Sequence, residues 1–318
     1  MQTSEVKDLA ARLRGEIGKA IVGQADTIDL MLTALFCGGH ILLEGPPGTA
    51  KTLLAQSFAA AVSLDFGRIQ FTPDLMPGDI VGTNLFNFQT STFTVNRGPI
   101  FCEVLLADEI NRTPPKTQAA LLEAMQERRV TLDGKAHSLS DRFMVIATEN
   151  PIEQQGTYPL PEAQLDRFLF KHVLAYPDET QERAIVAATG PSVRMPDPVS
   201  LGIVPVASRD AVAAAIATVA GAKLTDPIVQ YIVALVRATR TTAEISSGAS
   251  PRSAAMLAAA SRARAALDGR EYVIPDDVKA LILPALRHRI ILSPAAEIDG
   301  RKVDDVLTAI VERIEAPR

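Results

Sequence analysis

The segment Gly45-Pro-Pro-Gly-Thr-Ala-Lys51-Thr52 is the feature that most restricts the folds open to this chain. It follows a short apolar run at residues 40–44 and precedes a helical pattern that begins at Leu53. A strand, a glycine loop and a helix in this order present backbone N–H groups and the positive end of a helix dipole to phosphate oxygens. The segment therefore predicts a P-loop at the edge of a parallel α/β sheet, with ATP as the ligand.

Each residue of this loop has an expected role. The residues expected to contact the nucleotide are Gly45, Pro46, Pro47, Gly48, Thr49, Ala50, Lys51 and Thr52. Lys51 would pair with the β- and γ-phosphates, and the Thr52 hydroxyl would bind Mg²⁺. Ala50 stands where Gly usually precedes the Lys, so we expect it to keep a negative φ with its amide facing the nucleotide. A plain Gly-Pro turn before a helix is the alternative, and the flanking patterns disfavour it.

Four apolar runs have the length and composition of buried parallel strands, at residues 40–44, 67–71, 104–107 and 143–147. Helical patterns separate them. Two insertions read as protruding hairpins, one at 85–96 and one at 129–139, where Asp133-Gly134 is a strong turn signal. The fold class expected is α/β: a P-loop core with a parallel sheet flanked by helices, and two hairpin insertions.

The two ends of the chain are expected to be helical. Residues 7–39 show two apolar helix patterns that break near 22–24, and strands are expected to stop after Pro177. Helical patterns then occupy 209–220, 226–240, 251–267, 275–283 and 304–314, the third with Ser250 as N-cap. We expect a nucleotide-binding domain at 1–178 (P-loop 45–52, acidic strand 104–109) and an all-α domain at 179–318, with a loop-rich connection near 190–208.

Polar residues follow two of the predicted strands. The apolar run that ends in Asp108 and Glu109 would place Asp108 to hold Mg²⁺ and Glu109 to orient or deprotonate the attacking water. Asn150 follows the next strand and would help to place that water, or else cap the turn before Pro151. Arg252 lies in the first turn of a helix, where a cation opposes the dipole, so it is expected to have an anionic partner such as a phosphate.

Composition excludes several classes of protein. Lys and Arg number 32 against 37 Asp and Glu, for a net charge of -5, and aromatic residues reach 5%, which disfavours dedicated nucleic-acid binding. Cys37 and Cys102 lack CxxC spacing and are expected to be reduced, and the four histidines lack metal-ligand spacing. The apolar stretches are too short to span a membrane and no secretory signal is visible, so a cytoplasmic location is expected.

Longer motifs resemble those of the MoxR-type AAA+ ATPases. They include Phe71-Thr-Pro-Asp-Leu-Met-Pro-Gly-Asp79, Asn96-Arg-Gly-Pro-Ile-Phe101, Ala107-Asp-Glu-Ile-Asn-Arg112 and Leu160-Pro-Glu-Ala-Gln-Leu-Asp-Arg-Phe168. In the C-terminal part, Pro275-Asp-Asp-Val278 and Leu286-Arg-His-Arg-Ile290 are similar to the lid of that family. The resemblance covers nearly the whole chain, and Ala before the P-loop Lys is usual in the family.

The resemblance implies further roles. Arg167 would be an arginine finger that reaches the neighbouring subunit's site, and Arg252 would be the sensor 2 residue of the lid. The segment Ile21-Val22-Gly23-Gln24 would line the adenine pocket, and the hairpins would be the helix-2 and pre-sensor-1 insertions. A ring, most simply a hexamer, would hydrolyse ATP to remodel protein partners, often proteins with a von Willebrand factor A domain.

Several alternatives stay open at the level of sequence. A nucleotide-gated scaffold with little turnover, a nucleic-acid motor or loader, and a metal-chelatase subunit would all use the same core. Arg112 is either catalytic or paired with Glu123 or a neighbouring subunit. The hairpin side chains either grip a substrate or pack on their own domain, and these are Phe86, Phe88, Phe93 and Val95.

Overall fold

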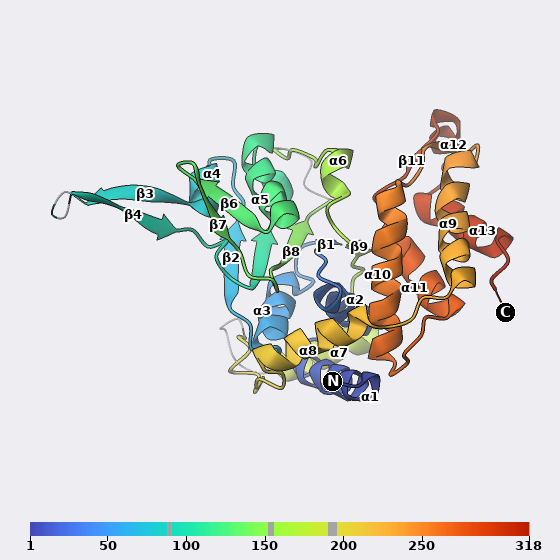
Figure 1. Ribbon diagram of the computed structural model, residues 1–318, viewed down its shortest axis with the longest axis horizontal. Helices are drawn as coiled ribbons and strands as arrows, with labels where there is room; N and C mark the ends of the chain where they lie inside the picture. The colour runs from blue at the N-terminus through green and yellow to red at the C-terminus, as the bar shows by residue number, and fades with distance from the viewer. Residues whose placement is uncertain (88, 90, 152–155, 190–195, 318) are drawn as a thin grey trace.

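The structure, a computed structural model, describes residues 1–87, 89, 91–151, 156–189 and 196–317. Its centre is a five-stranded parallel sheet in the order β2-β5-β8-β1-β9 (Figure 1). The strands, in that order, are Phe66–Gln70, Val104–Asp108, Met144–Glu149, Ile41–Glu44 and Phe170–Val173. The register pairs Gln70 with Asp108 and Glu44 with Glu149, so the carboxyl ends of the strands meet at one edge.

The two faces of the sheet pack against different helices because strand side chains alternate between faces. Ile41 and Leu43 belong to one apolar cluster, with the N-terminal helices and the C-terminal helices, whereas Leu42 belongs to a second cluster with helix α5. The helices of this part of the chain are α1 (Thr3–Ile17), α2 (Ala25–Phe36), α3 (Lys51–Ala61), α4 (Pro77–Val81), α5 (Pro115–Glu127) and α6 (Glu162–Leu165), with a 3-10 turn at Ile110–Arg112.

The four predicted strands are present, and β9 is a fifth that the sequence patterns did not predict. Its sequence, Phe-Lys-His-Val, lacks a continuous apolar run because β9 is an edge strand that pairs only with β1 among the strands of this sheet. Lys171 of β9 forms an ion pair with Glu44 of β1 at 2.5 Å. The edge position explains why a charged side chain is tolerated there.

Both predicted hairpins are confirmed. Strands β3 (Gly82–Asn87) and β4 (Thr92–Arg97) form an antiparallel arm that projects from the rest of the molecule (Figure 1). Strands β6 (Arg129–Leu132) and β7 (Lys135–Ser138) turn at Asp133 (φ 47°) and Gly134 (φ 77°). The two hairpins are joined because the Asn84 amide donates to Asp133 Oδ2 at 2.6 Å.

The structure shows how far several apolar side chains of the β3–β4 hairpin are exposed. Leu85, Phe86 and Val95 are exposed, which among the two open alternatives disfavours packing of Phe86 and Val95 onto their own domain. Phe88 lies outside the described residues, and of Phe93 the structure describes the backbone, which pairs with Phe86.

The five helices predicted beyond residue 208 are present: α8 (Arg209–Ala220), α9 (Asp226–Thr241), α10 (Pro251–Leu267), α11 (Pro275–Leu286) and α13 (Val303–Arg313). Helices α7 (Glu179–Thr189) and α12 (Pro294–Ile298) were not predicted. The expectation that strands stop after Pro177 is wrong, because β10 (Ile245–Ser247) pairs with β11 (Ile291–Leu292). Strands of this length are too short to show an alternating pattern.

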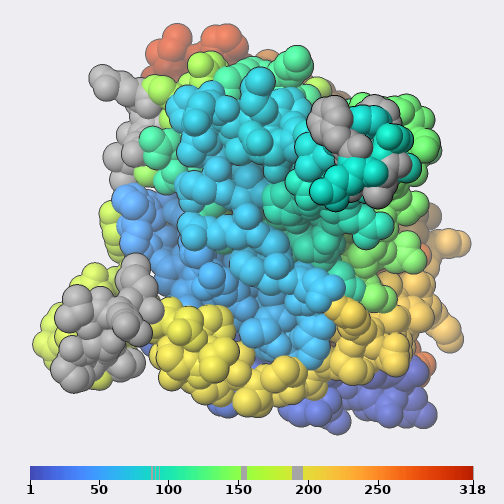
Figure 2. Space-filling model, turned by 90° about the vertical axis from the view of Figure 1, so that its left-hand side faces the viewer, coloured from blue at the N-terminus to red at the C-terminus, as the bar shows by residue number. Residues whose placement is uncertain are grey.

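Hydrogen bonds and ion pairs, besides the connecting chain, join the segment before the C-terminal helices to the sheet region. Residues 190–195 of the predicted loop lie outside the described residues, but beyond them the Val206 amide donates to Ala61 O at 2.9 Å. Arg209 forms ion pairs with Asp65 at 2.6 Å and Glu103 at 2.9 Å. Figure 2 shows this yellow segment against the blue surface of the α3–β2 region. Within the described residues, no helix has the length and apolar character needed to cross a membrane.

Candidate nucleotide site

The predicted P-loop connects β1 to α3 near the middle of the sheet. Its first amide, that of Gly45, donates to Glu149 O at 3.2 Å and so anchors the loop to β8. The loop then turns through Gly48 at φ 82° and Ala50 at φ 57° before α3 begins at Lys51.

Ala50 corrects one expectation from the sequence. Its φ is positive, whereas a negative value was expected to be necessary for phosphate binding. The left-handed conformation costs a residue with a Cβ roughly 1–2 kcal/mol, a strain of the kind that gathers at functional sites. Ala50 is exposed, and alanine is the smallest side chain that can carry this cost at the helix start.

The Lys51 side chain lies inside the curve of the loop. Its ammonium group donates to Gly45 O at 2.7 Å and to Pro46 O at 3.0 Å. Burial lowers the pKa of Lys51, while the charges of Asp108 and Glu109 act in the opposite direction. The cation is therefore held by two loop carbonyls, close enough to both carboxylates to interact with their charges.

The Thr52 hydroxyl donates to Asp108 Oδ2 at 3.3 Å. Two oxygen ligands at neighbouring corners of an Mg²⁺ octahedron lie roughly 3 Å apart, given Mg–O distances of about 2.0–2.1 Å. The pair therefore fits the magnesium site that the sequence predicts. The described residues contain no cluster of three or more His, Cys, Asp or Glu that could hold a metal ion.

Asp108 is held by two residues that the sequence patterns did not single out. Thr148 Oγ1 donates to Asp108 Oδ1 at 2.8 Å, and Arg68 Nη2 donates to Asp108 Oδ2 at 2.8 Å. Arg68 and Gln70 alternate along β2, so both point to one face, and Gln70 is in register with Asp108. The polar residues at every second position of β2 could have indicated a polar face in the sequence. Only the tertiary fold shows that this strand lies beside β5 and its acidic pair.

Glu109 has a strained backbone and a restrained carboxylate. Its φ is 56°, and its amide donates to Thr148 Oγ1 at 2.8 Å. Gln70 Nε2 and Arg112 Nη1 both donate to Glu109 Oε2, each at 3.0 Å. Arg112 therefore pairs with Glu109, whereas the sequence left open a catalytic role or a pairing with Glu123 or a neighbouring subunit.

Asn150 follows β8 and is 8% exposed. Because β8 lies between β5 and β1 in the sheet, Asn150 leaves the sheet between the acidic pair and the P-loop. The structure thus brings together the residues predicted from three separate strand ends.

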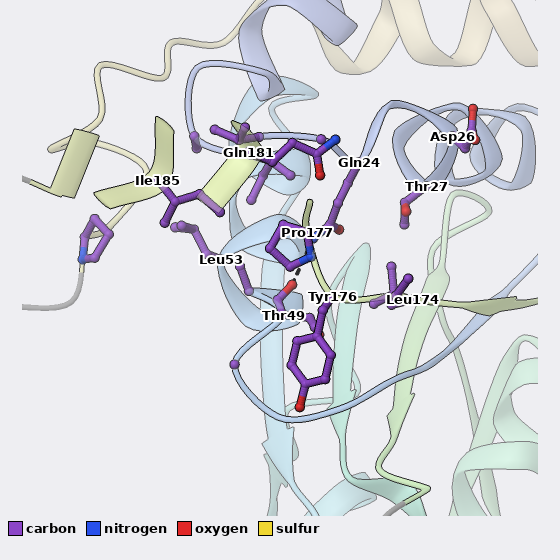
Figure 3. A pocket seen from close by; sticks show the side chains of 18 of the residues that line it. Gln24, Asp26, Thr27, Thr49, Leu53, Leu174, Tyr176, Pro177, Gln181 and Ile185 are labelled. Atoms are coloured by element: carbon purple, nitrogen blue, oxygen red, sulfur yellow. Dashed lines mark hydrogen bonds between the residues drawn. The ribbon is translucent and has the colours of Figure 1, made fainter. Parts of the chain in front are cut away.

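A cavity of about 830 Å³ opens beside the P-loop (Figure 3). Val22, Gly23 and Gln24 line it, together with Gly48, Thr49 and Ala50 of the loop. Gln24 Nε2 donates to Thr49 O at 2.9 Å, which ties the two segments. Tyr176, Pro177 and Gln181 also line it, and sequence patterns had not predicted them.

The two predicted arginines lie outside the cavity lining. Arg167 is partly exposed and donates from Nε to Gln126 Oε1 at 3.2 Å. Arg252 is exposed in the first turn of α10, which the Ser250 side chain caps as predicted. No salt bridge to Arg252 is found among the described residues, so this part of the chain does not supply the anionic partner that the helix dipole predicts.

Comparison with known proteins gives the family. Residues 40–170 match the ATPase family associated with various cellular activities (AAA), and residues 237–310 match the AAA lid domain. The chain is 42% identical to the uncharacterized protein YeaC of Bacillus subtilis, covering 95% of this chain and 92% of that one. It is 40% identical to chaperone MoxR1 of Mycobacterium tuberculosis, covering 95% and 81%, and 31% identical to protein MoxR of Methylorubrum extorquens, covering 98% and 96%.

A solved structure extends the likeness to the whole fold. The crystal structure of a candidate ATPase from Cytophaga hutchinsonii superposes with a TM-score of 0.90 at 37% identity, over 99% of this chain and 97% of that one. Together with the P-loop, the acidic strand and the lid helices, these matches show that the chain belongs to the MoxR-type AAA+ ATPases.

Proposed function

We propose that this protein binds ATP with Mg²⁺ and hydrolyses it to ADP and phosphate. The observation that carries the proposal is the convergence of Lys51, Thr52, Asp108 and Glu109 beside a cavity of nucleotide size. Val22, Gly23 and Gln24 would hold the adenine side, and Gly45, Pro46, Pro47, Gly48, Thr49 and Ala50 would present loop amides to the phosphates.

In the proposed mechanism, each residue has a separate task. Lys51 leaves the loop carbonyls and pairs with the β- and γ-phosphates. Thr52 and Asp108 would hold Mg²⁺, which neutralises phosphate charge when bound. Glu109 accepts a proton from the attacking water or orients it, and Asn150 fixes the position of that water from the neighbouring strand.

Completion of the site requires a second subunit in this proposal. Arg167 is partly exposed, as a residue that enters a neighbour's site must be. An arginine finger accelerates hydrolysis roughly 10³- to 10⁵-fold. We therefore place the chain in a hexameric ring, with Arg252 closing each lid on its own nucleotide.

The biological task we propose is the remodelling or maturation of protein partners in the cytoplasm. The relative named chaperone MoxR1 supports a chaperone-like role, and the family resemblance suggests clients with a von Willebrand factor A domain. The net charge of -5 favours protein over nucleic-acid clients. Residues 1–178 and 179–318 would move relative to one another during the cycle.

Replacing Glu109 with Gln tests the proposal. Glu109→Gln keeps the size of the side chain and removes the base, so ATP binding should stay within about twofold while turnover falls at least about 100-fold. Binding is measured with a fluorescent ATP analogue and turnover by phosphate release. The matched control is Glu127→Gln, which changes an exposed carboxylate whose described ion pair is with Arg129 at 3.4 Å. Normal turnover in Glu109→Gln would remove Glu109 from the mechanism.

A further inference from the structure

Arg289 is a buried arginine outside the nucleotide site whose contacts are concentrated on one short segment. Its side chain is 2% exposed, and Nε donates to Asp166 Oδ1 at 2.7 Å. Nη2 donates to Phe168 O at 2.6 Å and to Asp166 O at 3.1 Å, and Nη1 donates to Leu169 O at 3.1 Å and to Ala285 O. Each nitrogen of the guanidinium is used.

Apart from Ala285 O, these acceptors belong to residues on both sides of Arg167 in the chain. The carbonyl of Asp166 precedes Arg167 in the chain, and the carbonyls of Phe168 and Leu169 follow it. His288 adds a bond from Nε2 to Phe168 O at 3.0 Å. Burial, and next the charge of Arg289, lower the pKa of His288 well below its ordinary value, so the imidazole is a neutral donor. We name Arg289, His288 and Asp166 the finger clamp.

The finger clamp also contacts the helix that carries Arg252. Arg289 Nη2 lies 3.1 Å from Sδ of Met256, one turn beyond Arg252 on α10. The charge of Arg252 is close enough to contribute to the lowered pKa of Arg289, after the larger effect of burial. Figure 1 shows α6, which leads into Arg167, on the side of the sheet domain that faces α10 and β11.

The charged partner of Arg289 and three of its carbonyl acceptors belong to 166–169, whose conformation sets where the partly exposed Arg167 side chain stands. A buried guanidinium with all its donors satisfied is also rigid, because loss of any partner leaves a charged group without compensation.

We infer that Arg289 is a positioning residue for Arg167, through which the lid of one subunit controls the finger that it presents to the next. The inference rests on the proposed trans role of Arg167. In this arrangement, a lid displaced by nucleotide binding at Arg252 moves α10, His288 and Arg289, which pull on residues 166–169 through their hydrogen bonds. The arginine presented to the neighbouring site then moves as well.

The variant Arg289→Lys tests the inference because Lys keeps the charge but cannot make the forked set of bonds. Its own P-loop and cavity are untouched, so KM for ATP should stay within about twofold. Since a misplacement of about 1 Å can cost roughly 100-fold in rate, kcat should fall about 10- to 100-fold. Asp166→Asn removes the charge from the other partner and should give the same split if Arg289→Lys folds poorly.

Mixed rings distinguish a misplaced finger from a loss of stability, because a protein that is only destabilised would not regain ATP turnover when it is mixed with a second variant. Arg289→Lys chains mixed with Lys51→Ala chains should regain activity, because a sound P-loop then meets a sound finger at some interfaces. Mixed with Arg167→Ala chains they should not, because every finger is then impaired. Native mass spectrometry establishes that mixed rings form, and Arg167→Ala with Lys51→Ala is the reference pair.

The outcomes separate this inference from the function on which it rests. If the reference pair fails to recover in mixed rings, the trans role of Arg167 fails and this inference fails with it. If the reference pair recovers and neither Arg289→Lys nor Asp166→Asn recovers with Lys51→Ala, the inference alone is overturned. Arg270→Lys is the matched control, because it disturbs another lid ion pair, to Asp277 at 2.6 Å, and should keep full activity in folded rings.

Discussion

At the scale of single residues, Glu149 shows how burial at the edge of the sheet changes the pKa of a carboxyl group. It ends β8 in register with Glu44, and Lys171 is ion-paired to Glu44. Burial is the main cause that raises the pKa of Glu149 to about 7; the charge of Lys171 opposes this shift and that of Glu44 adds to it. The side chain therefore gives up its proton near neutral pH.

This pKa predicts a pH dependence of stability. A carboxyl whose pKa is raised on folding holds a proton in the folded state that the unfolded chain has released, so stability falls as pH rises from about 4.5 to about 7. Glu149→Gln removes the titration. Its free energy of unfolding should match wild type at about pH 4 and exceed it by on the order of 1–3 kcal/mol at pH 8. Urea denaturation across this range measures the difference. Glu182→Gln, on the exposed side of α7, is the control, and parallel curves for Glu149→Gln and wild type would refute the assignment.

At the scale of elements, the base of the β3–β4 hairpin depends on close backbone contact. Gly98 follows β4, and its amide donates to Val81 O at 3.3 Å. A Cβ at Gly98 would lie 2.3 Å from Ile80 O and 2.6 Å from the Gly82 amide nitrogen. Both neighbours are backbone atoms, which cannot rotate away as a side chain can.

Substitution of Gly98 should disrupt the close backbone contact at the base of the β3–β4 hairpin and so lower the stability of the protein. We expect Gly98→Ala to lower the free energy of unfolding by about 2–3 kcal/mol through overpacking. Gly15→Ala is the opposite case. Gly15 lies within α1, and a methyl group added there would meet no neighbouring atom within 4 Å. This substitution should raise the free energy of unfolding by about 0.5–1 kcal/mol. Chemical denaturation of the three proteins compares them. An unchanged midpoint for Gly98→Ala would mean that the hairpin base adjusts without cost.

At the scale of the whole molecule, one apolar cluster runs through the N-terminal helices, one face of the sheet and the C-terminal helices. The chain is thus built as a continuous body, and Arg167 lies partly exposed on it with its side chain bonded to Gln126. If Arg167 completes the site of a neighbouring chain, activity belongs to the assembly and not to the chain.

Dilution measures this dependence. Turnover per chain should fall as the ring dissociates, towards the roughly 10³- to 10⁵-fold lower rate expected without an arginine finger. ATP binding should survive dilution, because the P-loop and its cavity lie within one chain. Arg167→Ala is the control and should stay low at every concentration. Constant turnover per chain down to the monomeric range would contradict assembly-dependent hydrolysis.

Local sequence determined much of the fold and the core of the candidate site. The P-loop, the Asp108-Glu109 pair and Asn150 were readable because each depends on a strand, a turn or a helix start within a few residues. Ser250 at the start of α10 and Asp133-Gly134 in the second hairpin were readable for the same reason.

The tertiary structure alone decided the rest. Arg68, Gln70 and Thr148 reach the acidic pair only because β2 and β8 flank β5, and the order of strands in a sheet leaves no local trace in the sequence. Arg289 meets Asp166 across 123 residues for the same reason. Helix and strand formation follows from neighbouring residues, whereas the partners of a buried polar group depend on how the elements pack.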